Sequence, residues 1–375
     1  MTEAGLYVHV PFCLTRCGYC DFNAYAGLDH LKAPYVRALA AEAALVSGAW
    51  EGMPFASIFV GGGTPTTLPA ADLASLLRTL AGAFSLAPDA EITVEANPDT
   101  VDETYLRALR GTGVTRLSFG LQSFDPAVLA ALERVHTAEA AVEAFRAARR
   151  VGFDDVNLDL IYGAHAETIA SWKDTLARTI DLQPDHVSAY ALTVEPSTML
   201  GRNVASGKTP APDPDRQAEM YDAACAMLGA AGLVHYEVSN WARPGRESVH
   251  NRGYWEDRPY LGLGAGAHSH RGDERWWNVK PPTAYLEAVA RGLAPVGGRE
   301  RVEADERRLE RLLLGLRTSH GVPTVWVPEG VVERYAALDL GHAHGERFVL
   351  SERGMLLANQ AVLDIDGASV AQAVG

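Results

Sequence analysis

Three closely spaced cysteines are the residues best able to do chemistry in this chain. Cys13, Cys17 and Cys20 form the pattern Cys-x3-Cys-x2-Cys. Three thiolates can hold three irons of a four-iron cluster, and the fourth iron then stays open to another ligand. Structural zinc takes four protein ligands, so a zinc site would need one more, such as His9. The pattern predicts a [4Fe-4S] cluster and leaves zinc open as the alternative.

The fourth cysteine lies far from this group. Cys225 falls in a predicted helix at residues 214–230, on the same apolar stripe as Tyr221 and Leu228. Cysteine on such a stripe behaves as a small buried hydrophobe, and that is the interpretation we adopt. The three clustered cysteines are too few and too local to form a disulfide framework, which again favours metal binding.

Two further features could bind a ligand beside the cysteines. The turn Gly61-Gly62-Gly63-Thr64-Pro65 closes a predicted strand, and consecutive glycines let the backbone approach a ligand closely. Polar residues also stand near strand ends, namely Glu95, Gln122 and Asp159, with Arg134 shortly after Gln122. Acidic groups can bind amines or ribose hydroxyls, and arginine can pair with a carboxylate. A buried salt-bridge network without a ligand is the alternative.

The elements that must position these residues alternate in type. Short apolar runs, which we take as strands, lie at residues 6–10, 57–60, 91–95, 115–121, 155–161 and 186–192. Amphipathic helical segments lie between them at residues 35–46, 70–84, 102–110, 138–151 and 169–180. Repeated βα units predict an α/β protein with a parallel sheet. Six strands are two short of a closed barrel, so we expect a partial, three-quarter, six-stranded parallel β/α barrel.

Side chains alternate between polar and apolar along these strands. Thr93 and Glu95 share one face of their strand, and Asn157 and Asp159 share one face of theirs. A polar face exposed to water would explain the pattern in an antiparallel sheet. Parallel sheets are usually covered on both sides, so we expect the polar face to line a ligand cavity at the strand ends.

The chain changes character after residue 232. A Trp-, Gly- and His-rich stretch covers residues 235–277, and Pro281-Pro282 opens another helix. We expect one domain at residues 1–295, holding the barrel and this extension, and a small C-terminal α+β module at 296–375. Helices are predicted at 302–318 and 332–338, with a hairpin at 348–357.

Composition and charge narrow the function classes. The chain has 375 residues, 47% hydrophobic and 21% charged, as in folded water-soluble proteins. Its net charge of −14 supplies no cationic field for nucleic acid, so we expect none as a partner. Residues 52–71 are uncharged but contain four Gly and three Pro, unlike a membrane-spanning helix. The first residues lack the pattern of a signal peptide, so we expect a cytoplasmic location.

Several of these motifs together resemble a known family. Tyr7-x-His9-x-Pro11-Phe12, the three cysteines and the Gly61–Pro65 turn are similar to radical S-adenosylmethionine (SAM) proteins, specifically the oxygen-independent coproporphyrinogen III oxidase-like group. The resemblance continues through the motifs around Glu95, Ser118 to Phe124, Arg134 and Asn157 to Gly163, and spans most of residues 5–300.

The resemblance implies a role for each matched residue. Cys13, Cys17 and Cys20 would hold the cluster, whose open iron would chelate the amino and carboxylate groups of SAM. Tyr19 would pack near the adenine. The contacts implied for the remainder of SAM involve Gly62, Gly63, Thr64, Glu95, Gln122, Arg134 and Asp159, with Tyr7 beside them. The resemblance implies no further catalytic residue.

Two features separate branches of this group. Phe22 stands where the oxidases carry another cysteine, and the first strand begins about five residues into the chain, without the extension that covers their substrate. Conversely, His250-Asn251-x-x-Tyr254-Trp255 resembles the motif of the heme chaperone branch, whose histidine is implicated in holding heme. From the residues alone, a histidine with two aromatics more often forms a packed turn.

The resemblance therefore implies a heme chaperone that passes heme to heme-requiring apoproteins, with His250 near an accessible surface. The alternative is an enzyme that oxidatively decarboxylates coproporphyrinogen III. The sequence leaves open the recipient protein, cleavage of SAM, transient membrane docking and a homodimer.

Overall fold

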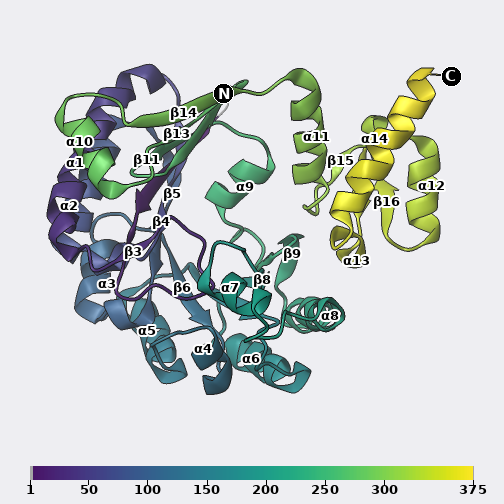
Figure 1. The fold of residues 1–375 in the computed structure, drawn as a ribbon, viewed down its shortest axis with the longest axis horizontal. Helices are drawn as coiled ribbons and strands as arrows, with labels where there is room; N and C mark the ends of the chain where they lie inside the picture. The colour runs from purple at the N-terminus through teal and green to yellow at the C-terminus, as the bar shows by residue number, and fades with distance from the viewer. Residues whose placement is uncertain (1–2, 375) are drawn as a thin grey trace.

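One large sheet organises the chain, and the computed structural model describes residues 3–374 (Figure 1). The six predicted strands are adjacent and parallel, in the order β1 (Ala4–Val10), β4 (Phe55–Gly62), β5 (Leu86–Ala96), β6 (Arg116–Gln122), β7 (Val156–Tyr162) and β8 (His186–Ala191). The predicted α/β class with a parallel sheet is confirmed.

The sheet continues beyond these six strands to a total of twelve. A seventh strand, β11 (Tyr260–Leu263), is parallel to β1, and antiparallel β12 (His268–Arg271), β13 (Glu274–Asn278) and β14 (Val296–Arg301) follow it. At the other edge, β10 (Asn240–Ala242) and β9 (Val234–Glu237) extend the sheet beyond β8. The expected count of six was therefore too low, because these short strands are not separated by helices of regular period.

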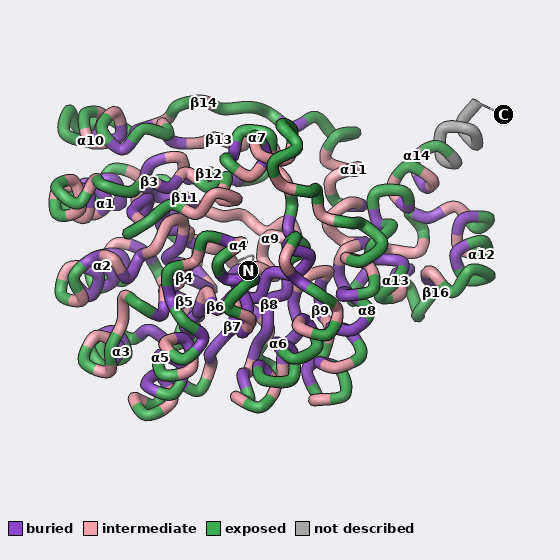
Figure 2. The backbone as a smooth tube through the Cα atoms, turned by 60° about the horizontal axis from the view of Figure 1, so that its bottom comes forward, coloured by how far each residue is buried: buried purple, intermediate pink, exposed green. Residues whose placement is uncertain are grey.

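Helices cover one face of the parallel strands (Figures 1 and 2). They are α1 (Lys32–Val46), α2 (Ala70–Ala83), α3 (Glu103–Arg110), α5 (Ala138–Val151), α6 (Ile169–Asp181) and α8 (Pro214–Ala230), with short helices α4 (Pro126–Ala131), α7 (Met199–Ala205) and α10 (Pro282–Ala290) in the connections. Thr137 caps α5, and Thr168 caps α6 in a capping box with Ser171. The apolar faces of these helices and strands form one continuous core.

The opposite face of the strands is polar and buried. Ser57, Thr93, Ser118, Asn157 and His186 are at most 5% exposed. The helix α9 (Val249–Trp255) packs against β1 and β4 on this side. The predicted polar face therefore lies inside the protein, as expected, and is not open to water.

The C-terminal residues form a small unit with its own apolar cluster, which runs from Leu312 to Ile365. It contains α11 (Ala304–Gly315), β15 (Val322–Pro323), α12 (Glu329–Ala337), β16 (Gly341–His344), β17 (Arg347–Leu350), α13 (Glu352–Met355) and α14 (Ala358–Val374). The hairpin is β16–β17, so its predicted position at 348–357 was wrong. Gly345, at φ +57°, makes the turn, and Ser351 caps α13 and ends the second strand.

The division of the chain into two domains near residue 295 remains a prediction. The first strand after that position, β14, still pairs with β13 in the large sheet. Among the helices within residues 3–374, none combines the length and hydropathy needed to cross a bilayer.

Candidate functional site

A cavity of about 530 Å³ gathers most of the predicted site residues at the carboxyl ends of the parallel strands. Parallel strands place their carboxyl ends at one edge of a sheet, where α/β proteins commonly bind ligands. The predicted residues that line it are Cys13, Cys17, Tyr19, Cys20, Gly62, Gly63, Thr64, Glu95, Gln122, Arg134 and Asp159. The structure thus brings together eleven side chains and glycines taken from five strands and their loops.

Cys13 is the last residue of β2 (Phe12–Cys13), Cys17 and Cys20 lie in the loop between β2 and β3 (Tyr25–Ala26), and all three are half-buried. All three line the same cavity, with Cys13 beside Thr64 and Cys17 beside Arg134. Three thiolates suit a four-iron cluster with one open iron, whereas structural zinc takes a fourth protein ligand.

The glycine turn makes room for this loop. A Cβ atom at Gly63 would lie 2.7 Å from the carbonyl oxygen of Phe12 and 3.0 Å from Cys13 Sγ. The next residue, Thr64, places its hydroxyl 3.8 Å from the same sulfur. Burial raises the pKa of the Cys13 and Cys20 thiols, so a bound positive group would be needed to keep them as thiolates.

Glu95 lies near the end of β5 and points at Gly62, the last residue of β4. Its Oε2 accepts a hydrogen bond from the backbone N–H of Gly62 at 3.1 Å. Burial, with a smaller contribution from the charge of Asp159, raises the pKa of Glu95 to about 8. A buried carboxylate is stabilised by a nearby positive charge, and the hydrogen bond from Gly62 provides only a neutral donor. A ligand with an ammonium or sulfonium group would provide that positive charge.

Asp159 lies on the neighbouring strand β7 in a network of neutral partners. Its carboxylate accepts hydrogen bonds from Ser118 Oγ at 2.9 Å and from Asn157 Nδ2 at 2.8 Å. Burial raises the pKa of Asp159 although these hydrogen bonds oppose the shift. Two acidic side chains thus converge in one cavity, which suits a ligand with ammonium and hydroxyl groups.

Arg134 supplies the cation on the other side of the cavity. Its guanidinium donates to the carbonyl of Gly120 at 3.3 Å and lies 3.6 Å from Cys17 Sγ. Its Nε is buried and has no hydrogen-bond partner among the described residues. An unpaired buried donor is costly, and a ligand carboxylate would satisfy it. The donors and acceptors present therefore fit an amino acid bearing a positive sulfur and a ribose.

Gln122 reaches the cavity through an unusual backbone conformation. It has φ +65°, and the pairing of β6 with β7 is irregular between Gly120 and Gln122. Such a conformation costs of order 1–3 kcal/mol and is enriched at functional sites. Tyr19, from the cysteine loop, is next to Arg134, and burial raises the pKa of its phenol.

Two predicted residues do not line the cavity. Tyr7 lies deeper on β1, where its hydroxyl is 2.9 Å from His9 Nδ1 and its ring is near Phe59 and His250. Burial raises the pKa of Tyr7, with a smaller contribution from the charge of Glu95, which does line the cavity.

His250 is buried inside the protein, so the expectation of a histidine near an accessible surface was wrong. It is 3% exposed, and its ring stacks on Phe59 with centroids 5.1 Å apart. Nδ1 lies 2.8 Å from Ser57 Oγ, and Nε2 lies 2.9 Å from Tyr254 Oη. Burial lowers the pKa of His250 to about 3. Helix α9 points this side chain toward β4 because Ser248 caps the helix and Glu91 accepts from the His250 N–H.

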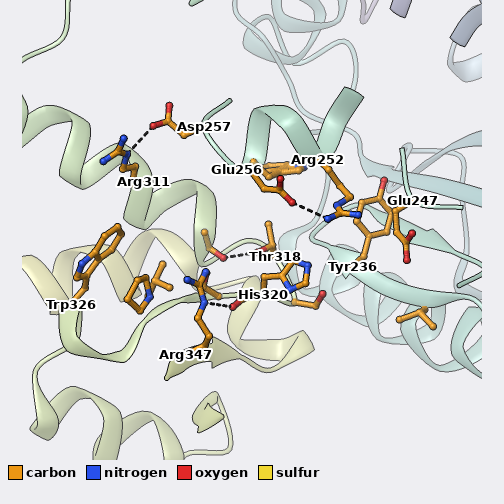
Figure 3. A pocket seen from close by; sticks show the side chains of 17 residues that line it. Tyr236, Glu247, Arg252, Glu256, Asp257, Arg311, Thr318, His320, Trp326 and Arg347 are labelled. Carbon is orange, nitrogen blue, oxygen red and sulfur yellow. Dashed lines mark hydrogen bonds and ion pairs between the residues drawn. The ribbon is translucent and has the colours of Figure 1, made fainter. Parts of the chain in front are cut away.

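Other residues of the same motif face a second cavity, of about 390 Å³, between α9 and the C-terminal unit (Figure 3). Arg252 and Trp255 line it from α9. Lining residues from the C-terminal unit include Arg311, His320, Trp326 and Arg347. Arg252 pairs with Glu256 and Arg311 with Asp257, whereas Arg347 donates to the backbone carbonyls of His320 and Gly321.

Sequence reasoning missed several residues of the first cavity. They are Asn97, Ser118, Glu133, Tyr190, Thr193 and Glu195. Ser118 and Tyr190 could have been found from the sequence, because the period-two pattern places both on the polar face of their strands. Glu133 and Glu195 lie in loops, where no periodicity indicates which way a side chain points.

The matching family model is that of the radical SAM superfamily, over residues 7–179. Curated relatives extend the similarity along almost the whole chain. Heme chaperone HemW of Mycobacterium tuberculosis (strain ATCC 25618 / H37Rv) is 44% identical, over 97% of this chain and 95% of that protein. Heme chaperone HemW of Bacillus subtilis is 34% identical, over 94% of this chain and 97% of that protein.

The chain belongs to the HemW family of radical SAM proteins. A mitochondrial relative from Bos taurus, radical S-adenosyl methionine domain-containing protein 1, is 37% identical over 95% of this chain and 82% of its own. Among solved structures, coproporphyrinogen III oxidase (HemN) from Escherichia coli has a TM-score of 0.84 at 25% identity, covering 97% of this chain and 90% of that one. This chain and the Escherichia coli enzyme therefore share a fold.

Proposed function

We propose that this protein is a heme chaperone, which binds heme and transfers it to heme-requiring apoproteins. The observation that carries the proposal is the similarity, at 44% identity over nearly the full length, to a protein named heme chaperone HemW. The motif at His250 to Trp255 agrees with that assignment, and its arginine and tryptophan face a cavity large enough to receive part of a macrocycle.

A [4Fe-4S] cluster and SAM belong to the first cavity in this proposal. Cys13, Cys17 and Cys20 would hold the cluster, and SAM would lie between the glycine turn, Glu95, Asp159 and Arg134. A reduced cluster of this kind can supply one electron to the sulfonium of SAM. The sheet around the cavity would curve as a partial barrel, with the C-terminal module as a separate domain.

Heme would be received at the second cavity. Trp255 and Trp326 offer apolar area to a porphyrin, and Arg347 can pair with a propionate because its described hydrogen bonds go only to backbone carbonyls. His250 has the neutral imidazole that heme iron needs, since its lowered pKa excludes the charged form at neutral pH. For His250 to reach iron, its contacts with Ser57 and Tyr254 must open.

The competing function is that of the structurally similar oxidase, which would act on coproporphyrinogen III. Phe22 weakens this reading, because it lines the first cavity with 65% of its surface exposed and offers neither a thiol nor a polar group. A radical intermediate at such an open mouth would also be accessible to water.

The test uses cluster-loaded protein under anaerobic conditions. Heme binding is followed by its Soret absorption, and transfer by reconstitution of a heme-free cytochrome or peroxidase. Coproporphyrinogen III turnover is measured in the same preparation with SAM and a reductant. We expect heme binding and transfer without protoporphyrinogen, and weaker heme binding in Arg347→Ala but not in the exposed control Arg78→Ala. Efficient turnover without heme transfer would support the oxidase.

The remaining assignments are part of the same proposal. The protein would act in the cytoplasm, with heme and apoproteins as partners and without nucleic acid. Transient docking at a membrane and a homodimer are both compatible with a chaperone that must meet its recipients.

A further inference from the structure

Three metal-ligating side chains that are distant in sequence meet at the junction with the C-terminal unit. Cys225 comes from α8, His235 from β9 and Glu352 from the first turn of α13. Their sulfur, nitrogen and oxygen ligand atoms all lie within 4.8 Å of one another. Helix α13 lies beside α8 in both overall views (Figures 1 and 2). The prediction that Cys225 is buried in the apolar core is confirmed, and its thiol also lies beside two further ligand groups.

The imidazole is held in place by its neighbours. The His235 ring stacks on Trp241, with centroids 4.5 Å apart and planes 22° apart. Its Nε2 lies 3.4 Å from the hydroxyl of the buried Tyr221. Burial lowers the pKa of His235 to about 4, so the ring is neutral at neutral pH and has a lone pair for a metal.

The other two groups differ in access to solvent. Cys225 is 6% exposed, and burial together with the nearby Glu352 charge raises the pKa of its thiol to about 12. Glu352 is exposed, so it leaves an entry path and room for a water ligand. A thiolate, an imidazole and a carboxylate form a ligand set that suits zinc, with a fourth tetrahedral position left over.

We propose that Cys225, His235 and Glu352 bind one divalent cation of the zinc class. On binding, a metal–sulfur bond forms, the thiol S–H bond breaks and the proton leaves to water, so no oxidant or reductant is needed. The ion ties α13 of the C-terminal unit to α8 and β9. Because Val234, next to His235, lines the second cavity, the ion also holds one wall of that cavity in position. This site is independent of the proposed heme function.

The experiment uses the full chain with its iron–sulfur cluster in place, so that Cys13, Cys17 and Cys20 are occupied. The protein is treated with a chelator, desalted, incubated with zinc chloride and desalted again, and zinc per chain is measured by mass spectrometry. We expect one zinc per chain in the wild type. Cys225→Ser and His235→Gln should weaken binding by at least about tenfold. Replacing zinc with Co²⁺ should give a thiolate-to-cobalt absorption band that Cys225→Ser lacks.

Substitutions of exposed residues separate a loss of zinc binding from a loss of folding. Glu352→Gln alters an exposed side chain, so it should fold normally yet lose zinc affinity, while Glu329→Gln and His30→Ala should retain it. Zinc should raise the unfolding temperature of the wild type and of these controls, and less so that of Glu352→Gln. If folded wild-type protein takes up no zinc, or if the Cys225, His235 and Glu352 variants bind it as tightly, the proposal is wrong.

Discussion

The side chain of Glu95 is held by the backbone of Gly62. The Glu95 carboxyl accepts the Gly62 N–H at 3.1 Å, and a Cβ atom at the preceding Gly61 would lie only 2.8 Å from the same oxygen. The acid near the end of β5 therefore reaches its position only because the Gly61–Pro65 turn, which begins with the last residues of β4, lacks side chains there. The same turn borders Cys13, so one stretch of glycines positions both the cysteine loop and the acidic wall of the cavity.

The first prediction concerns the space that Gly63 leaves. Gly63→Ala would press its Cβ atom against the Phe12 carbonyl and Cys13 Sγ, so the cysteine loop must shift. We expect a loss of stability of about 1–3 kcal/mol and a lower iron content after reconstitution. Gly82→Ala is the matched control, because a Cβ atom at this α2 position meets nothing within 4 Å. It should gain up to about 1 kcal/mol and keep its iron. Equal iron content in both variants would contradict this account.

The second prediction concerns the cluster ligands. Replacing Cys13, Cys17 or Cys20 with Ala should abolish uptake of about four irons per chain and the broad absorption of the iron–sulfur centre. Cys225→Ser should take up iron normally, because this residue lies outside the cavity. Iron and sulfide analysis after anaerobic reconstitution measures both. Uptake of one zinc by the three cysteines, with no iron, would refute the cluster.

The third prediction follows from the pKa of Glu95, which burial raises to about 8 from an ordinary 4.5. The folded state thus binds a proton that the unfolded state releases, and this contribution to stability is present below pH 4.5 and lost as pH rises toward 8. Without SAM, the wild type should lose more unfolding free energy between pH 5 and 8 than Glu95→Gln, by a few kcal/mol.

Urea unfolding at both pH values measures this difference, and the exposed Glu219→Gln is the control. Calorimetry in two buffers of different ionisation enthalpy adds a second measurement. SAM binding should release a proton from the wild type near pH 7 and not from Glu95→Gln. Identical pH dependence in the wild type and Glu95→Gln would show that Glu95 is not protonated in the fold.

The fourth prediction concerns His250, whose pKa burial lowers from 6.5 to about 3. The fold excludes the charged imidazole, so stability present above pH 6.5 is lost as pH falls toward 3. Between pH 6.5 and 5 the wild type should lose about 2 kcal/mol more than His250→Gln, which cannot titrate. Denaturant unfolding of both proteins tests this, and the exposed His165→Gln should behave as the wild type. If heme binds through His250, the same substitution should also change the heme spectrum.

Patterns among residues close together in the sequence predict much of this protein's organisation. The Cys-x3-Cys-x2-Cys spacing, the βα alternation and the period-two placement of Thr93 with Glu95 and Asn157 with Asp159 each depend on residues a few positions apart. Regular strands and helices repeat such local relationships, so the six parallel strands and their polar inner face were predictable.

Tertiary packing decided the features that join distant segments. Arg134 approaches Cys17 across 117 residues, and His250 turns inward because Ser57 and Glu91 hold α9 against the sheet. The meeting of Cys225 with Glu352 likewise requires the C-terminal unit to dock beside α8. No spacing along the chain encodes these distances, because burial and long-range hydrogen bonding set them only when the segments pack together.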